Sequence, residues 1–173
     1  MMKPYEILIR EETEQDIAKI TEITIAAFKS MAVSNQTEHL IINALRSANA
    51  LTLSLVAEAE GEVVGHIAFS PVTISDGTAD WYGLGPVSVL PRYQRMGIGA
   101  ALITEGLLRL QSLGAQGCCL VGHPEYYPRF GFRNVPQLTL EGVPPEVFFA
   151  LSFDGEFPKG RVEFHKSFLM DHH

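Results

Sequence analysis

The sequence predicts a mixed α/β domain, in which one β-sheet of parallel and antiparallel strands carries helices on both faces. Three observations support this fold class. Strand-like segments follow one another with tight turns between them, two amphipathic helices follow the first strand, and a third helix joins two strands that must therefore run parallel. A chain of 173 residues is long enough for one domain with its own core. We therefore expect residues 1–173 to form a single domain with the order β-α-α-β-β-β-α-β-α-β.

The first three elements are a strand and two helices. Residues 5–10 alternate apolar and polar side chains, which is typical of a half-buried strand. Thr13 and Asp16 have the spacing of a helix N-cap and its partner three residues on, and the apolar residues that follow recur at helical spacing up to Phe28. A second amphipathic helix is predicted over 37–48. Its apolar face would consist of Leu40, Ile41, Ala44 and Leu45.

Three strands are predicted after these helices. Segments 51–58 and 62–74 are rich in β-branched and apolar residues, and Glu60-Gly61 between them predicts a tight turn. Asp76-Gly77 is a second hairpin signal. The next strand would cover residues 80–89, so the three segments form a run of neighbouring strands.

The second half of the chain is less regular. A long helix is predicted over 97–113, and Gly114 is a suitable residue to end it, because glycine readily adopts the left-handed conformation after a helix. A buried strand would follow at 117–121. The remaining chain contains a short helical piece at 145–151 and a final strand at 161–168.

Composition restricts the class of protein. Hydrophobic residues make up 46% of the chain and charged residues 19%, as in soluble globular proteins, and neither a membrane-spanning run nor a signal peptide is apparent. A net charge of −7 argues against nucleic acid as the main partner. Cys118 and Cys119 are adjacent in a strand, so they would point to opposite faces as unpaired core thiols, which suits a cytoplasmic location. No Cys/His spacing suggests a metal site.

The segment from 90 to 102 carries the strongest functional signal. Gly97 and Gly99 lie where a strand ends and a helix begins, so backbone N–H groups and the helix dipole would attract a phosphate or pyrophosphate. Leu102 stands where a dinucleotide-binding loop needs its third glycine, and no Gly-Lys-Ser/Thr sequence follows, so neither of those two loops fits. An ordinary helix start with two glycines for turn geometry is the alternative.

The spacing of Gln94, Gly97 and Gly99, flanked by Arg92 and Arg95, resembles the acetyl-CoA pyrophosphate loop of the GNAT superfamily of acyl-CoA-dependent N-acetyltransferases. The strand before this loop and the helix after it also fit that family. The loop alone is short, so a second motif is needed to support the resemblance.

A second motif follows the buried strand. Tyr127, Gly131 and Phe132 match the Tyr-x-x-x-Gly-Phe element of GNAT enzymes, and segment 122–133 is similar to the bacterial YhbS-like branch of predicted acetyltransferases. A buried aromatic turn that ends at Gly131 is the alternative. Two motifs in the right order and at a fitting distance make acyl-CoA binding the favoured interpretation.

The resemblance implies the GNAT fold, in which the fourth and fifth strands diverge and the pantetheine arm binds between them like an added strand. Gly85-Pro86 predicts a bulge there, because proline cannot serve a central ladder. The family's pantetheine-contacting Asn is Leu120 here, so that contact must come from elsewhere. The residues assigned to acetyl-CoA are Pro86, Val87, Ser88, Val89, Arg92, Gln94, Arg95, Met96, Gly97, Ile98, Gly99, Ala100 and Tyr126.

The implied reaction moves an acetyl group from acetyl-CoA to a primary amine by direct attack in a ternary complex, with no covalent enzyme intermediate. Tyr127 would protonate or hydrogen-bond the leaving thiolate, although the neighbouring Tyr126 leaves a one-residue ambiguity. An N–H near Val89 would polarise the thioester carbonyl. His66 and His123 are the candidate bases; a packed, hydrogen-bonded core histidine is the alternative for His66. Further candidates for the base are Asp80, Glu58 and a chain of water molecules.

The acceptor is expected to be a small amine or a peptide, shaped by loop 31–36 and by segment 148–157, and the chain is expected to be a monomer or homodimer. Two other classes stay open. One is a non-catalytic acyl-CoA-binding or sensing module on the same fold, which would bind acetyl-CoA without releasing free thiol. The other is a generic nucleotide or phosphate-ligand binder, which would bind adenosine diphosphates that lack pantetheine.

Overall fold

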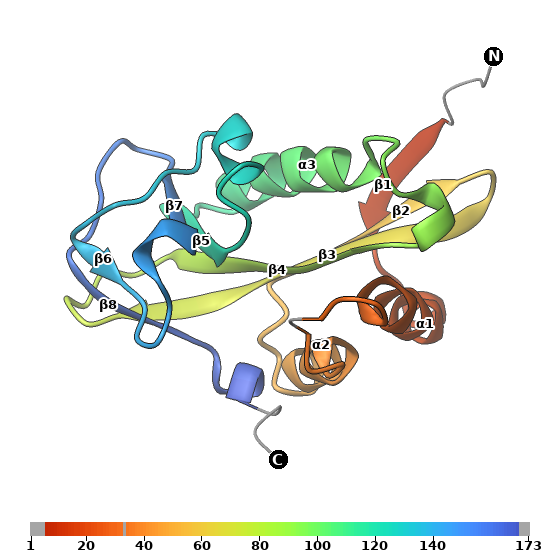
Figure 1. Cartoon of the computed structure of the whole chain (residues 1–173), viewed down its shortest axis with the longest axis horizontal. Coiled ribbons are helices and arrows are strands. Elements are labelled where there is room, and N and C mark those ends of the chain that lie inside the picture. Colours follow the sequence, from red (N-terminus) through yellow and green to blue (C-terminus); the bar gives the residue numbers. More distant parts are fainter. Residues whose placement is uncertain (1–5, 33, 170–173) are drawn as a thin grey trace.

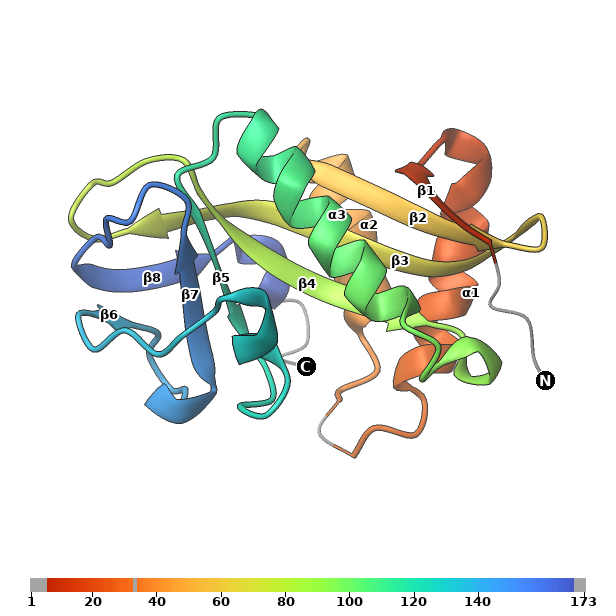
Figure 2. The same ribbon diagram turned by 90° about the horizontal axis from the view of Figure 1, so that it is seen from above.

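The computed structural model describes residues 6–32 and 34–169, and the predicted fold class is confirmed. One sheet carries helices on both of its faces (Figure 1). Helices α1 (Ile17–Phe28) and α2 (Glu38–Ser47) cover one face, and α3 (Ile98–Ser112) lies across the other, as the view from above also shows (Figure 2).

The sheet runs in the order β1-β2-β3-β4-β5-β7, with β8 paired to β3 and β6 paired to β8. Within this path only β4 and β5 are parallel, because α3 carries the chain back between them. The strands are β1 (Ile7–Glu11), β2 (Leu53–Ala59), β3 (Glu62–Ile74), β4 (Trp81–Val89), β5 (Gly117–Val121), β6 (Leu138–Thr139), β7 (Phe148–Ser152) and β8 (Gly160–Phe164).

The start of α1 has the predicted cap. The Thr13 N–H donates to the Asp16 carboxylate (2.7 Å), and a single 3-10 turn, Glu14–Asp16, leads into the helix. Arg10 donates to both carboxylate oxygens of Asp16 at 2.7 and 3.1 Å. These hydrogen bonds outweigh burial and lower the pKa of Asp16 to about 2, so this ion pair ties β1 to the start of α1. Tyr5, placed in the first strand by the sequence pattern, lies outside the described residues.

The apolar face of α2 differs by one residue from the prediction. Ile41 and Leu45 are buried as expected, but Leu40 is 41% exposed and Ile42 is buried in its place. Ile41, Ile42 and Leu45 form one stripe on a helix of 3.6 residues per turn, whereas Leu40 points away from its centre. Because residues 40–42 are all apolar, the sequence did not determine which of them face the core.

The chain after β5 is where the predicted elements were wrong. The helix expected after β5 is only a 3-10 turn, Tyr127–Phe130, and the helical piece expected at 145–151 is a 3-10 turn followed by β7. β7 pairs antiparallel with all of β5. A short, continuous run of apolar residues is compatible with a buried helix or a buried strand, so the periodicity of the sequence could not decide between them. The final strand ends at Phe164, and a 3-10 turn follows.

The two sheet faces have separate cores. Cys118 packs in the core beneath α3 and Cys119 in the core on the opposite face, and both side chains are fully buried, which confirms the expected split. Burial raises the pKa of the Cys119 thiol to about 12, so it is a poor nucleophile at neutral pH. No helix in the described part of the chain is long and apolar enough to cross a membrane.

Candidate active site

β4 and β5 separate after three paired positions. Trp81, Tyr82 and Gly83 pair with Gly117, Cys118 and Cys119, but β4 then continues along β3 to Val89 without β5 (Figure 2). At the point of departure Gly85 and Pro86 are the extra residues of a bulge, since Phe69 pairs with Leu84 and Ile67 pairs with Val87. The strand divergence and the bulge both agree with the sequence analysis.

The free edge of β4 presents backbone groups to the gap. The Leu90 N–H donates to the Val64 carbonyl on β3 at 2.9 Å. Because residues along a strand alternate in the edge to which their N–H and C=O point, those of Val87 and Val89 face away from β3, toward the gap. The Val89 carbonyl accepts a hydrogen bond from the Gln94 side chain (3.0 Å). The Val87 carbonyl and the N–H groups of Val87 and Val89 are thereby directed at whatever occupies the gap.

The loop after β4 turns sharply into α3. Arg95 and Gly97 both have left-handed backbones, at φ 66° and 83°, and the helix begins at Ile98. Ala101 donates to the Gly97 carbonyl (3.0 Å). The preceding N–H groups, from Ile98 to Ala100, have no intrahelical acceptor, and the helix dipole makes this end attractive to anions.

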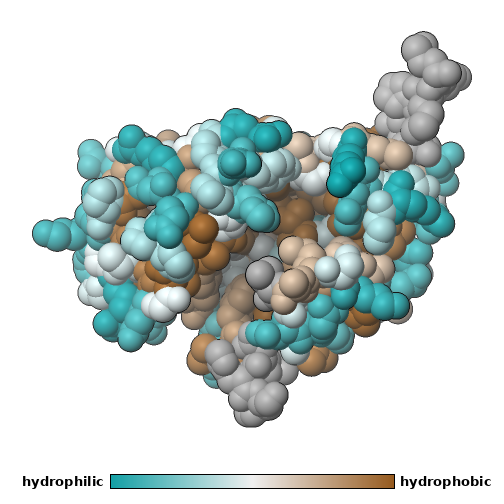
Figure 3. All heavy atoms as spheres, viewed as in Figure 1, coloured by the Kyte–Doolittle hydropathy of each residue, from teal (hydrophilic) through white to brown (hydrophobic). Residues whose placement is uncertain are grey.

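A cavity of about 510 Å³ joins the β4 edge, the loop and the start of α3. Figure 3 shows a hollow on this face, with hydrophobic residues gathered along its walls. The lining residues are Ala27, Phe28, Met31, Val87, Val89, Tyr93, Gln94, Arg95, Gly97, Ile98, Gly99, Ala100, Tyr126 and Arg129. Of the residues assigned to acetyl-CoA, Pro86, Ser88, Arg92 and Met96 lie outside this lining.

Residues of α1 and Arg129 were missed by the sequence analysis. Ala27 and Phe28 reach the cavity only because α1 packs against the sheet, and no local pattern marks them. Met31, which also lines the cavity, belongs to loop 31–36, which was expected to shape the acceptor site. Arg129 lies inside the Tyr-x-x-x-Gly-Phe element, and a basic side chain within that motif could have been predicted to line the site. Its guanidinium sits 4.5 Å from the centre of the Tyr126 ring, and its Nε donates to the Tyr126 carbonyl at 3.0 Å.

The two loop arginines have different surroundings. Arg92 is bonded to both carboxylate oxygens of Glu62 at 3.1 and 3.2 Å and lies over the Tyr93 ring. Arg95 lines the cavity and makes no ion pair with another described residue. Of these two loop arginines, Arg95 is therefore the one available to an anion in the cavity.

The adjacent tyrosines stand edge to face, with ring centroids 5.0 Å apart. The Tyr126 hydroxyl lies over Gly99, 3.9 Å from where a β-carbon would stand. Tyr127 packs its ring against Gly122 and edge-on to Phe132. Burial raises the pKa of Tyr127 to about 12, so this hydroxyl stays protonated across the neutral range.

The two candidate histidines are placed differently. His66 is fully buried on the sheet face beneath α1 and α2, with Nε2 2.8 Å from Ser54 Oγ, and burial lowers its pKa to about 4. His123 is exposed after β5 and engages the turn through its backbone carbonyl. Glu58 is held in an ion pair with Arg10. Among residues 6–32 and 34–169, no cluster of His, Cys, Asp or Glu could hold a metal ion.

Comparison with known proteins identifies similar sequences and structures. The model of the GNAT acetyltransferase domain matches residues 51–134. The uncharacterised N-acetyltransferase YhbS of Escherichia coli K12 is 36% identical over 128 residues, which cover 73% of this chain and 74% of YhbS. A GNAT family acetyltransferase from Brucella melitensis, crystallised with acetyl-CoA, has 50% identity and a TM-score of 0.84 over 95% of this chain and 99% of that chain. YhbS crystallised with CoA gives a TM-score of 0.87, 30% identity and coverage of 98% and 95%.

Proposed function

This chain belongs to the GNAT acetyltransferase family and is an acyltransferase, and from that premise we propose that it transfers the acetyl group of acetyl-CoA to a primary amine. The observation that carries the proposal is the gap between β4 and β5 immediately beside the start of α3. We propose further that residues 1–173 form one catalytic domain.

The pyrophosphate and the pantetheine arm of acetyl-CoA each have matching groups in and beside this gap. The pyrophosphate would accept hydrogen bonds from the N–H groups of residues 98–100, with Arg95 supplying positive charge. The pantetheine amides would pair with the outward backbone groups of Val87 and Val89, as an added strand does. The Brucella relative that was crystallised with acetyl-CoA, at 50% identity, supports this assignment of the donor.

The reaction would proceed by direct attack. The amine lone pair forms a bond to the thioester carbon, the carbonyl oxygen takes the electron pair of its π bond, and the Val89 N–H stabilises that oxyanion. The C–S bond then breaks as the carbonyl reforms, and the Tyr127 hydroxyl hydrogen-bonds the departing thiolate. The nitrogen loses one proton to give the neutral amide, and that proton neutralises the thiolate to give free CoA. No enzyme nucleophile is needed, and the two cysteines are buried with raised thiol pKa values.

Thiol release from acetyl-CoA tests the proposal. The full chain is incubated with acetyl-CoA and a panel of alkylamines, polyamines, amino acids and peptides, and free CoA is measured with a thiol reagent. We expect one amine class to release thiol and to gain the mass of one acetyl group. Binding of acetyl-CoA without thiol release across the panel would instead favour a non-catalytic acyl-CoA-binding module. Tight binding of adenosine diphosphates that lack pantetheine would favour a phosphate-ligand binder.

A further inference from the structure

The apolar stripe by which α1 packs on the sheet continues into the cavity. Ile20 and Ile23 are fully buried where α1 lies against β3 and β4. Ala27, Phe28 and Met31 continue the same stripe at helical spacing, but these three residues line the cavity. Phe28 is only half-buried, and Met31 is 41% exposed. The end of the stripe therefore offers an apolar surface to a ligand in the cavity.

Hydrogen bonds hold the backbone at this surface in place. The Phe28 carbonyl accepts from the Met31 N–H at 3.1 Å and from the Gln36 side chain at 2.6 Å. The Ser34 N–H donates to the Met31 carbonyl at 3.1 Å, so the chain after α1 folds back on the end of the helix. A surface that is already ordered costs a ligand less free energy to bind than one that must first be fixed.

The proposed position of acetyl-CoA leaves this surface free. The pyrophosphate is assigned to the start of α3 and the pantetheine arm to the outer edge of β4. Helix α1 lies on the other face of the sheet from α3 (Figure 1), so Phe28 and Met31 border the cavity on the side away from the pyrophosphate. An acceptor must reach the thioester from a side that CoA does not occupy, and these two side chains lie on such a side.

The charges in the cavity are all positive. The chain has 20 acidic residues against 13 lysines and arginines, yet none of the acidic residues that the structure describes lines the cavity. The charged side chains of the lining are those of Arg95 and Arg129. An acceptor that carries a second ammonium group would therefore meet two guanidinium groups and no carboxylate there.

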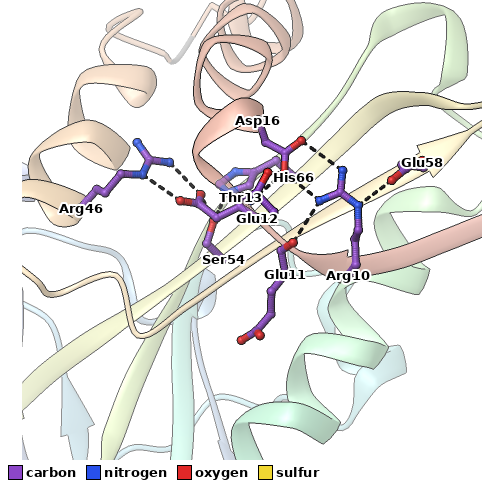
Figure 4. Close-up of polar contacts among 9 residues, drawn as sticks. All are labelled: Arg10, Glu11, Glu12, Thr13, Asp16, Arg46, Ser54, Glu58 and His66. Atoms are coloured by element: carbon purple, nitrogen blue, oxygen red, sulfur yellow. Dashed lines mark hydrogen bonds and ion pairs between the residues drawn. The ribbon is translucent and has the colours of Figure 1, made fainter.

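The carboxylates around the start of α1 are engaged in ion pairs (Figure 4). Arg46 donates to both carboxylate oxygens of Glu12, at 2.9 and 2.7 Å. Arg10 donates to both carboxylate oxygens of Asp16 and also to Glu58. None of these three carboxylates lines the cavity. A second ammonium group in the cavity would therefore lose water without gaining a counter-ion, which costs free energy.

We propose that the acceptor is a primary amine on an apolar chain or ring, without a second positive charge, and that Phe28 and Met31 select it. The proposal rests on the amine acetylation proposed above, and the reaction is the one written there. The apolar group packs against these two side chains, and its burial supplies binding free energy. Polyamines and amino sugars carry further ammonium groups, for which the cavity provides no partner, so they are poor acceptors.

A matched pair of amines tests this selectivity in the full chain. In cadaverine an ammonium group replaces the terminal methyl group of hexylamine, while the length of the molecule and the basicity of the reacting amine stay nearly the same. Thiol release from acetyl-CoA should give a kcat/KM for hexylamine that is at least about 30-fold higher than for cadaverine. Equal values, or a preference for cadaverine, would overturn the proposal.

Met31→Glu should change the selectivity in a defined direction. It removes an apolar contact and supplies a counter-ion, so kcat/KM should fall about fivefold for hexylamine and rise about fivefold for cadaverine, with acetyl-CoA affinity unchanged. Ile25→Glu is the matched control, because Ile25 is 44% exposed on α1 and lies outside the cavity lining. The same change in Ile25→Glu, or a loss of acetyl-CoA affinity in Met31→Glu, would contradict a role of Met31 in acceptor choice.

Calorimetric titration of the two amines into the CoA-saturated chain separates this proposal from the acetylation itself. Hexylamine should bind more tightly than cadaverine, and Met31→Glu should narrow the difference. If binding follows this pattern but neither amine releases thiol from acetyl-CoA, the selectivity stands and the acetylation has failed for these amines. If both amines release thiol equally well, the acetylation stands and the selectivity is wrong. If neither amine binds or reacts, both proposals are wrong for this class of amine.

Discussion

Replacing Tyr127 by phenylalanine should slow acetyl transfer by roughly 10- to 150-fold while leaving the fold and the acetyl-CoA affinity intact. The Tyr127 ring packs against Gly122 and Phe132, and its hydroxyl makes no hydrogen bond to another described residue. Phenylalanine keeps that packing and removes only the hydroxyl. The substitution therefore tests the hydroxyl's part in the reaction with little structural cost.

The magnitude follows from the pKa of Tyr127. At about 12 it lies well above the value of roughly 8.5 for an ordinary thiol, so full transfer of its proton to a thiolate would be uphill by about 5 kcal/mol. The hydroxyl is therefore better suited to donate a hydrogen bond to the sulfur. A hydrogen bond to a charged group contributes about 1.5–3 kcal/mol, which corresponds to the roughly 10- to 150-fold rate effect.

The assay is steady-state thiol release, with Tyr126→Phe as the matched control. Tyr126 is the neighbouring ring and its hydroxyl lies over Gly99, so its loss should alter acetyl-CoA binding more than kcat. A Tyr127→Phe enzyme with unchanged kcat would refute the reasoning. A large fall in kcat for Tyr126→Phe alone would transfer the role by one residue.

Three further predictions concern the loop, the core and pH. Arg95→Ala should weaken acetyl-CoA binding by about 1 kcal/mol in calorimetry, and Arg92→Ala by less, because Arg92 is bonded to Glu62; equal effects would contradict this difference. Gly106→Ala should lower the free energy of unfolding by about 1–2 kcal/mol, because the new β-carbon would stand 2.5 Å from the buried Phe69 ring. This clash should outweigh the better helix propensity of alanine. A variant that is more stable in urea denaturation would be inconsistent with it. The Asp16 carboxylate, with its pKa lowered to about 2, should contribute about 2.5 kcal/mol to the free energy of unfolding above pH ~4. This contribution should disappear as the pH falls toward ~2. If an Asp16→Asn chain loses stability in acid to the same extent, Asp16 is not its source.

The elements with local signals were predicted well. The Thr13 cap, the Glu60-Gly61 turn and the end of α3 at Gly114 each depend on residues close together in the sequence, and all three are present in the structure. β7 was missed because its residues, Phe148 to Ser152, become a strand only by pairing with β5. That pairing is a long-range contact, and an apolar run of this length is compatible with either element.

The candidate site divides in the same way. Gly97 and Gly99 were identified because the loop itself imposes their spacing, and both line the cavity. Phe28 reaches the cavity through the packing of α1, which no local pattern encodes. His66 was considered as a base from its position in a strand. Its bond to Ser54, and through Ser54 to Glu12, depends on strand register and could not be read from the sequence.

Calorimetric titration of acetyl-CoA into the wild type and Gly99→Glu tests the central claim most directly. Gly99 lines the cavity, and a β-carbon there would stand 3.9 Å from both the Tyr126 hydroxyl and the Val89 side chain, so a glutamate would extend into the cavity and place a negative charge at the start of α3. Thr104→Glu adds the same charge on an exposed position of the same helix and serves as the control. The proposed site predicts binding to the wild type and to Thr104→Glu, and none to Gly99→Glu. Unchanged affinity in Gly99→Glu would contradict acetyl-CoA binding in the gap between β4 and β5.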